Sequence, residues 1–181
     1  MYNIDISLVN SAYLYYLMRG YEPLSAPLLV DKDILDITLP EGRQGKQHLD
    51  KFYVGSAEQS FYQLMKDGLE PKGKYMMLTP CQRDEEASES HLEIFLKLEL
   101  ISTRTTPQNI AKDAFDFYKM LGEEAKLVSK EGFCQYDLEI GGVEVGSYGC
   151  RMYDGVCVSY GTGLALPRFS QARSRNKGIA L

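Results

Sequence analysis

A strict alternation of apolar and polar side chains from His91 to Ile101 limits this segment to one kind of structure. The apolar positions are Leu92, Ile94, Leu96, Leu98 and Leu100, and the positions between them hold His91, Glu93, Phe95, Lys97 and Glu99. Successive side chains of a β-strand point to opposite faces of its sheet. The segment is therefore predicted to be a strand with one face in the core and one face that can carry chemistry.

Further strand signals lie on both sides of this segment. Lys74 to Arg83 is predicted to pair with it antiparallel, through the acidic loop Asp84 to Ser90. Leu24 to Val30 contains Pro27, which has no ladder donor, so an edge or interface strand is expected there. The remaining signals are a hairpin of Phe133 to Ile140 and Val143 to Val145 around Gly141-Gly142, and a strand from Val156 to Tyr160 that leads into a glycine-rich turn and a last helix.

Helical signals are separated from these strands. The predicted helices run from Ser7 to Arg19, from the capping-box residue Ser56 to Gly68, and from Thr106-Pro107 to about Ser129. The polar segment from Leu39 to Lys51 is expected to be a loop. Segregated helices and strands predict an α+β fold, an antiparallel β-sheet flanked by helices.

Size and charge restrict the class of protein. A chain of 181 residues with 44% hydrophobic residues is expected to form a single domain, residues 1–181. A net charge of -5 argues against a generally cationic surface for nucleic acid, although four basic residues follow the last acidic one: Arg168, Arg173, Arg175 and Lys177. No apolar run approaches the ~18 residues of a membrane span and no basic leader begins the chain, so a cytoplasmic protein is expected.

Two separated stretches fit one triphosphate site. Cys81-Gln82-Arg83-Asp84-Glu85, followed by His91 and Phe95, places a guanidinium, carboxylates and an aromatic ring on neighbouring strands. Gly161-Thr162-Gly163 precedes Arg168 at a predicted helix start, where glycines allow close backbone approach and the helix N-terminus favours an anion. Together they indicate a nucleotide site.

In this arrangement the chain resembles the catalytic core of class II aminoacyl-tRNA synthetases, most closely the aspartate, asparagine and lysine subgroup. The first stretch resembles the second signature motif of that class. The resemblance implies that Arg83 holds the α-phosphate of ATP and the acceptor carboxylate, that Glu85 lies beside the adenine, that His91 completes the motif, and that Phe95 stacks on the ring.

The second stretch resembles the third motif, with Gly161 and Gly163 beside the nucleotide and Arg168 on the γ-phosphate. It departs from the family pattern at Ala165, where a third glycine is usual, and at Pro167, where an acidic residue is common. These departures put the fit around the ribose in doubt, whereas Arg168 still occupies the expected helix start.

The resemblance extends to the metal and the amino acid. Asp137 and Glu144 match residues that hold Mg²⁺ with ATP, and carboxylates are the hard oxygen ligands that Mg²⁺ prefers. Arg151 matches the residue that binds the side chain of aspartate or asparagine, or it pairs internally with Asp154. Glu58 or Gln59 is a candidate for the α-ammonium group.

The resemblance covers roughly Leu8 to Arg173 and includes no anticodon-binding barrel. The leading hypothesis is an ATP- and Mg²⁺-dependent ligase that forms an aminoacyl-adenylate and passes the aminoacyl group to tRNA, another nucleic acid, a carrier protein or a small amine. A homodimer is expected through Leu8 to Val30, a helix followed by a strand with Pro27, which resembles the first motif. The alternatives are a non-catalytic synthetase-like binding or dimerisation module, and an enzyme that acts directly on nucleic acid through its basic C-terminal segment.

Overall fold

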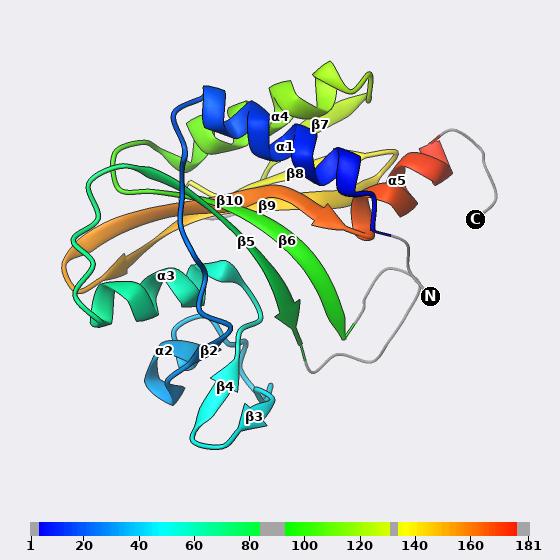
Figure 1. Ribbon diagram of the computed structural model, residues 1–181. Coiled ribbons are helices and arrows are strands. Elements are labelled where there is room, and N and C mark those ends of the chain that lie inside the picture. Colours follow the sequence, from blue (N-terminus) through cyan, green and yellow to red (C-terminus); the bar gives the residue numbers. More distant parts are fainter. Residues whose placement is uncertain (1–3, 84–92, 131–133, 177–181) are drawn as a thin grey trace.

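The structure is a computed structural model, and it describes residues 4–83, 93–130 and 134–176. Its main layer is a seven-stranded sheet with the strand order β1-β5-β6-β10-β9-β8-β7 (Figure 1). The strands are β1 (Glu22–Pro23), β5 (Lys74–Gln82), β6 (Ile94–Ser102), β7 (Ala125–Ser129), β8 (Tyr136–Ile140), β9 (Val143–Tyr153) and β10 (Val156–Leu166). All neighbouring pairs are antiparallel except the short β1, which runs parallel to β5.

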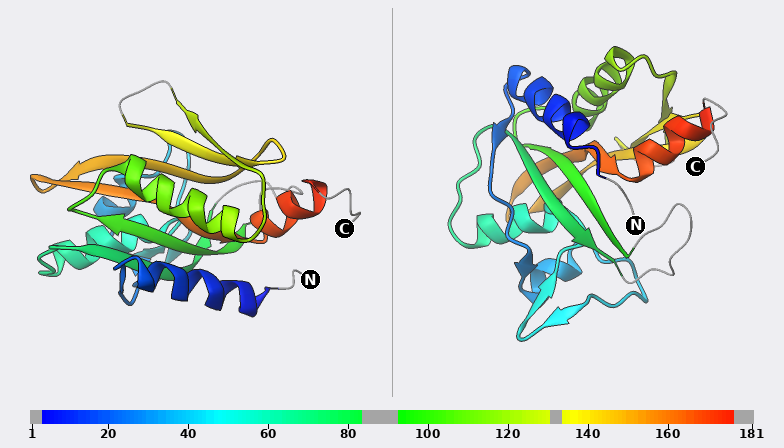
Figure 2. Two further views of the ribbon diagram at one scale, coloured as in Figure 1. Left: turned by 90° about the horizontal axis from the view of Figure 1, so that it is seen from above. Right: turned by 45° about the vertical axis from the view of Figure 1, so that its right-hand side comes forward.

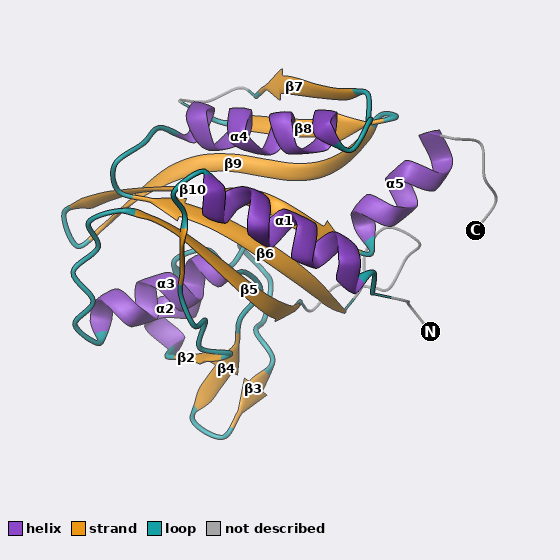
Figure 3. Cartoon of the chain, turned by 45° about the horizontal axis from the view of Figure 1, so that its top comes forward, coloured by secondary structure: helices purple, strands orange, loops and turns teal. Residues whose placement is uncertain are grey.

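Helices cover both faces of this sheet, as the α+β prediction requires. α1 (Ile6–Met18) and α4 (Pro107–Met120) lie across one face (Figures 2 and 3). α2 (Lys32–Asp36) and α3 (Ala57–Lys66) lie on the opposite side with a small sheet of β2 (Leu29–Val30), β4 (Lys51–Tyr53) and β3 (Gln47–His48). α5 (Arg168–Asn176) follows β10 directly.

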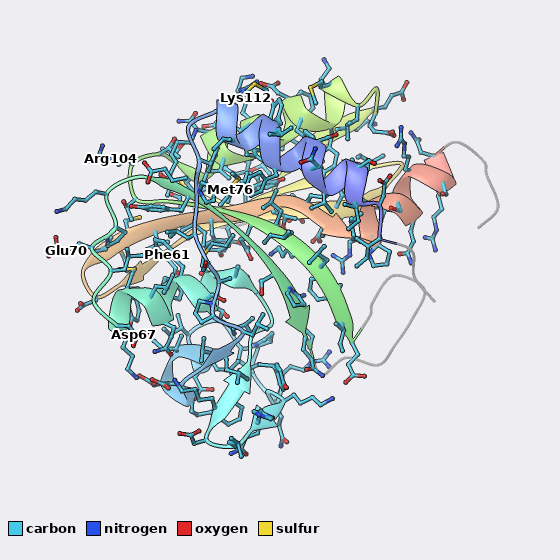
Figure 4. The ribbon with its side chains drawn as sticks, in the orientation of Figure 1. Phe61, Asp67, Glu70, Met76, Arg104 and Lys112 are labelled. Carbon is cyan, nitrogen blue, oxygen red and sulfur yellow. The ribbon has the colours of Figure 1, made fainter. Side chains whose placement is uncertain are left out.

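Each face of the sheet has its own hydrophobic core. Met76 of β5 belongs to the core beneath α1 and α4, whereas Phe61 of α3 belongs to the core on the other face (Figure 4). The alternation along β6 follows the prediction, because Leu98 and Leu100 lie in the first core. Lys97 and Glu99 consequently point to the α3 side, where the sheet is only partly covered.

The predicted helix starts at Ser56 and Thr106 are confirmed. The Ser56 hydroxyl accepts a hydrogen bond from the Glu58 N–H at 3.2 Å, and the Thr106 hydroxyl accepts one from the Asn109 N–H at 3.3 Å. Gln59 does not close a capping box on Ser56; its side-chain oxygen instead accepts the Gly55 N–H at 2.7 Å. Gln59 therefore fixes the turn that precedes α3.

Several predicted boundaries were wrong, and two of them change which elements the chain forms. The helix from Thr106 does not continue to Ser129: it ends at Met120, Gly122 takes a positive φ, and Ala125–Ser129 form β7. Leu24 to Val30 is not one strand, because Glu22–Pro23 pair with the large sheet and Leu29–Val30 with the small one. Pro27 lies between these two short strands, at a position that needs no ladder donor.

The glycine-rich segment before Arg168 is part of β10 and not a turn. A Cβ atom at Gly161 would lie 2.0 Å from the Tyr148 ring, so the glycine makes room for this buried side chain. Gly163 lies where the register between β10 and β6 shifts, and a Cβ there would lie 2.9 Å from the Tyr16 ring. Gly163 thus lies at the irregularity in β10, and both glycines leave room for buried tyrosine rings.

None of the helices among the described residues has the length and apolar character needed to cross a bilayer. The four cysteines, Cys81, Cys134, Cys150 and Cys157, are free thiols.

Candidate active site

Two adjoining cavities open on the partly covered face of the sheet. The first has a volume of about 280 Å³ and is lined by residues of β6, β9, β10 and the start of α5. The second, about 240 Å³, lies between the sheet, the start of α3 and the segment that follows α2. Arg83, Lys97 and Ser147 line both cavities, so these residues form the wall where the two meet.

The first cavity contains the predicted pair of Arg83 and Phe95. Arg83 follows β5, and its Nε donates a hydrogen bond to the Gly55 carbonyl at 3.0 Å. Its guanidinium lies over the Phe95 ring, 5.1 Å from the centroid, which is a cation–π distance. The arginine and the aromatic ring are thus brought together as predicted, and Glu85 and His91 lie outside the described residues.

Arg168 is located at the far end of the same cavity. It is the first residue of α5, as predicted, and its side chain is 3.6 Å from Glu144 of β9. α5 is attached to the rest of the fold by Arg173, whose Nε lies 2.8 Å from the buried carboxylate of Glu123. Arg168 therefore lines the cavity from a helix that is held in place. Arg173 pairs with a buried carboxylate, so it is not part of an unpaired basic surface.

The two predicted metal ligands differ in their surroundings. Glu144 lines the first cavity, whereas Asp137 of β8 is buried and paired with Lys130 at 2.6 Å. The second oxygen of Asp137, Oδ1, is buried and has no hydrogen-bond partner among the described residues. No group of three or more metal-binding side chains occurs among the described residues. The donor set still suits Mg²⁺, which commonly uses one or two carboxylates together with substrate phosphates.

Glu58 and Arg151 form an ion pair in the second cavity, in which the Glu58 carboxylate is buried and the Arg151 side chain is 36% exposed. The Arg151 Nε lies 3.1 Å from Glu58 Oε1, and the Tyr62 hydroxyl donates to the same oxygen at 2.7 Å. Burial raises the pKa of Glu58, while the Tyr62 hydrogen bond and the Arg151 charge oppose that rise. Arg151 thus has an internal partner, and this partner is Glu58, not the Asp154 that was considered from the sequence.

Both partners keep free hydrogen-bonding capacity on the cavity side. Among the described residues, Glu58 Oε2 receives no hydrogen bond and the terminal nitrogens of Arg151 donate none. Arg151 also lies over the Tyr160 ring, 5.7 Å from its centroid. The pair therefore presents an acceptor and a donor beside each other.

Gln59 has less freedom than Glu58. Its amide nitrogen donates to the Leu35 carbonyl at 3.1 Å, and its oxygen is already engaged by Gly55. Of the two sequence candidates for the ammonium group, Glu58 has an oxygen that accepts no hydrogen bond from the part of the chain that the structure describes.

A second ion pair, which is buried and which sequence reasoning did not assign to the site, lies on the shared wall. The Lys97 ammonium group donates to Glu99 Oε1 at 2.7 Å. Glu99 Oε2 accepts the Ser56 hydroxyl at 2.5 Å and the Ala57 N–H at 3.0 Å. The strict alternation along β6 was the available signal, because it put Lys97 and Glu99 on the same face as Phe95.

The glycines of the predicted third motif do not line the cavities. Thr162, between them, contributes to the wall of the first cavity, as do Ala165 and Pro167. Gly161 and Gly163 point instead toward Tyr148 and Tyr16. Their predicted contact with a nucleotide thus has no support from the cavity walls.

A mostly antiparallel sheet with this strand order, flanked by helices and carrying the site on one face, is the catalytic fold of class II aminoacyl-tRNA synthetases. Two solved structures of pyrrolysyl-tRNA synthetase from Desulfitobacterium hafniense show the similarity. One has a TM-score of 0.72 at 15% identity, covering 96% of this chain and 69% of its own length. The other has a TM-score of 0.73 at 16% identity, with coverages of 96% and 70%.

Sequence comparison adds no further relatives. No protein-family model matches the chain, and neither does any curated protein. The class II fold prediction is confirmed by the structures, whereas the aspartate, asparagine and lysine subgroup stays a prediction.

Proposed function

We propose that this chain is an adenylate-forming ligase that activates an amino acid with ATP. The observation that carries the proposal is the pair of adjoining cavities with Arg83 on their common wall. One cavity offers an aromatic ring and cations suited to a nucleoside triphosphate, and the other offers a donor and an acceptor suited to a small zwitterion. A reaction between two bound substrates requires this adjacency.

Each residue of the first cavity then has a role that its chemistry suits. Arg168 holds the γ-phosphate, Arg83 the α-phosphate and the substrate carboxylate, and Phe95 stacks on the adenine. Glu85 and His91 complete the adenine site in this proposal by resemblance to the class. Arg83 occupies one face of the Phe95 ring, so the base stacks on the opposite face.

Mg²⁺ is proposed to bind Glu144 and Asp137 together with phosphate oxygens. The unpaired Oδ1 of Asp137 supports this, since a buried carboxylate oxygen without a donor is costly unless it meets a cation. The ion would neutralise phosphate charge during the reaction. Lys130 competes for Asp137, and Arg168 lies near Glu144, so each carboxylate has a cationic neighbour when no metal is bound.

The Glu58–Arg151 pair supports an amide-bearing amino acid such as asparagine. Glu58 offsets the charge of Arg151, so an acidic side chain such as that of aspartate would meet a carboxylate as well as a cation. A carboxamide can donate to Glu58 Oε2 and accept from Arg151 at once. Aspartate is the second candidate.

The proposal includes a dimer of one-domain subunits and leaves the acceptor open. α1 has an apolar outer stripe in which Ile6, Leu14 and Met18 are 69%, 48% and 80% exposed. A second copy of this chain is the partner that the class resemblance implies for such a surface. The acceptor is tRNA, another nucleic acid, a carrier protein or a small amine.

The test is amino-acid-dependent exchange of labelled pyrophosphate into ATP, run with Mg²⁺ across the twenty amino acids. Exchange with asparagine, and loss of exchange in Arg168→Ala, is the expected result. The absence of exchange with all twenty amino acids, from folded protein that also binds no ATP, would contradict the proposal. That outcome would support the second candidate, a non-catalytic binding or dimerisation module, which the exposed stripe on α1 favours.

A further inference from the structure

We infer that Lys97 is a catalytic residue that contacts the α-phosphate of ATP and the carboxylate of the amino acid. The inference rests on the proposed function, because it assigns a contact within that reaction. It concerns a residue of this chain that the motif resemblance leaves without a role.

The position of Lys97 is the first argument. In adenylate formation the carboxylate oxygen and the α-phosphorus must meet where the amino-acid site joins the nucleotide site. Lys97, Arg83 and Ser147 are the residues that line both cavities among those described. Two of these three are cations, so the reacting centre would be held between a guanidinium and an ammonium group.

The unused donors of Lys97 are the second argument. Its side chain is 11% exposed, and Glu99 is its acceptor at 2.7 Å. An ammonium group has three N–H donors, and two of them find no acceptor among the described residues. Since unused donors on a nearly buried ammonium are costly, they indicate a ligand that accepts from them.

The rigidity of its support is the third argument. Glu99 is 1% exposed and is itself held by the Ser56 hydroxyl and the Ala57 N–H at the start of α3. A buried ion pair contributes little to stability compared with apolar residues of the same size. This pair instead fixes one ammonium group at the wall of two cavities, which is the requirement for preorganised electrostatic stabilisation.

Adenylate formation, the step that Lys97 assists, needs no proton transfer. A carboxylate oxygen of the amino acid forms a bond to the α-phosphorus, and the bond from that phosphorus to the oxygen bridging to the β-phosphate breaks. The electron pair of the broken bond leaves with pyrophosphate. Lys97 stays protonated and donates hydrogen bonds to an α-phosphate oxygen and to the attacking carboxylate, so the charge that develops between them is stabilised.

The experiment compares binding of AMP and of adenosine, which differ by the α-phosphate alone. Wild type is expected to bind AMP more tightly than adenosine. Lys97→Met should lose on the order of 10- to 100-fold in AMP affinity with adenosine affinity unchanged. Lys97→Gln, which can still donate to Glu99 and so preserve the local packing, should show the same selective loss.

Lys112→Met is the matched control, because this lysine lies on α4, is 67% exposed and pairs with Asp116 (Figure 4). It should bind both probes as wild type does. Full AMP preference in folded Lys97→Gln would overturn the inference even if pyrophosphate exchange by wild type supports the proposed function. A wild type that binds neither ATP nor AMP would overturn the proposed function itself. A loss for adenosine equal to the loss for AMP would show a structural role and would also overturn the inference.

Discussion

The charged side chains of the two cavities are paired differently. In the first, Arg168 and Glu144 stand 3.6 Å apart, a separation too long for a hydrogen bond, and both are partly exposed. In the second, Glu58 and Arg151 are in hydrogen-bond contact at 3.1 Å, and the Glu58 carboxylate is buried. Arg168 of the first cavity is therefore available for a polyanion, whereas the charge of Arg151 in the second is already neutralised by Glu58.

This difference teaches how one sheet face can select two unlike substrates. Exposed, loosely paired cations gain most when a triphosphate replaces water around them. A tight pair with a buried carboxylate gains little from a second charge, but it orders a donor and an acceptor for a neutral group. The shared wall with Arg83 is where the two kinds of site meet.

The largest expected effect comes from removing a loosely paired cation. Arg168→Ala should lower the rate of pyrophosphate exchange by about 100-fold, because one charge-stabilising contact of the triphosphate is lost. Folding should change little, since the pair with Glu144 is long and partly exposed. Arg104→Ala, an exposed arginine before α4, is the control (Figure 4). Equal exchange rates in the two variants would contradict the division between the cavities.

The next effect concerns choice of amino acid. Asparagine is expected to exceed aspartate in kcat/KM for exchange by about 100-fold, because the neutralised pair offers no net charge to a carboxylate. Glu58→Gln should shift the preference toward aspartate, since Arg151 would then be uncompensated. Exchange measured with both amino acids checks this, and a Glu58→Gln enzyme with unchanged preference would remove the role given to the pair.

Breaking the tight pair should reduce stability in a pH-dependent way. Burial holds the pKa of Glu58 above its unfolded value, so the stability contribution of this group is complete below the unfolded pKa and is lost as pH rises through the folded pKa. Arg151→Met removes a charge that lowers this pKa, and it should cost about 2 kcal/mol near pH 8. The cost should shrink as pH falls toward 4, because Glu58 is then increasingly protonated in both states.

Urea unfolding at pH 4 and at pH 8 measures that change. Arg104→Met is the control and should show the same small difference at both values of pH. A cost for Arg151→Met that does not depend on pH would mean that lost packing, and not the Glu58 charge, causes it.

The smallest expected effect concerns Mg²⁺. Lys130 occupies one oxygen of Asp137, so Lys130→Ala should lower the Mg²⁺ concentration for half-maximal exchange by roughly twofold to threefold. A titration of exchange activity with Mg²⁺ measures it. A rise in the required concentration would show that Lys130 supports the site and does not compete for it.

The pattern of neighbouring residues in the sequence was sufficient to predict many of the strands and helix starts. The period of two along β6 placed Phe95, Lys97 and Glu99 on the site face, and the caps at Ser56 and Thr106 marked two helix starts. These features depend on neighbouring residues alone. The end of α4 was missed because the apolar helical spacing continues to Ala125, which belongs to the next strand.

Long-range partners could not be predicted in this way. Glu58 and Arg151 are 93 residues apart in the sequence. The residues next to each of them in the sequence are equally compatible with a side chain that faces solvent. The role of Gly161 was predicted wrongly for a related reason. A glycine can indicate a turn or a place where a neighbouring side chain leaves no room for a Cβ atom, and the position of Tyr148 shows that the second applies. The role of Lys97 depends on where two cavities meet, which is a property of the folded chain.

The alternation in β6 also has a consequence for how this chain can evolve. Substitutions along the strand exchange one side chain at a time, but the loss or gain of a single residue between Phe95 and Glu99 would reverse the two faces of everything beyond it. Leucines would then line the cavities, and charged groups would enter the core beneath α1 and α4. The strand can therefore accept substitutions one at a time, whereas a change of its length would disrupt the core and the site together.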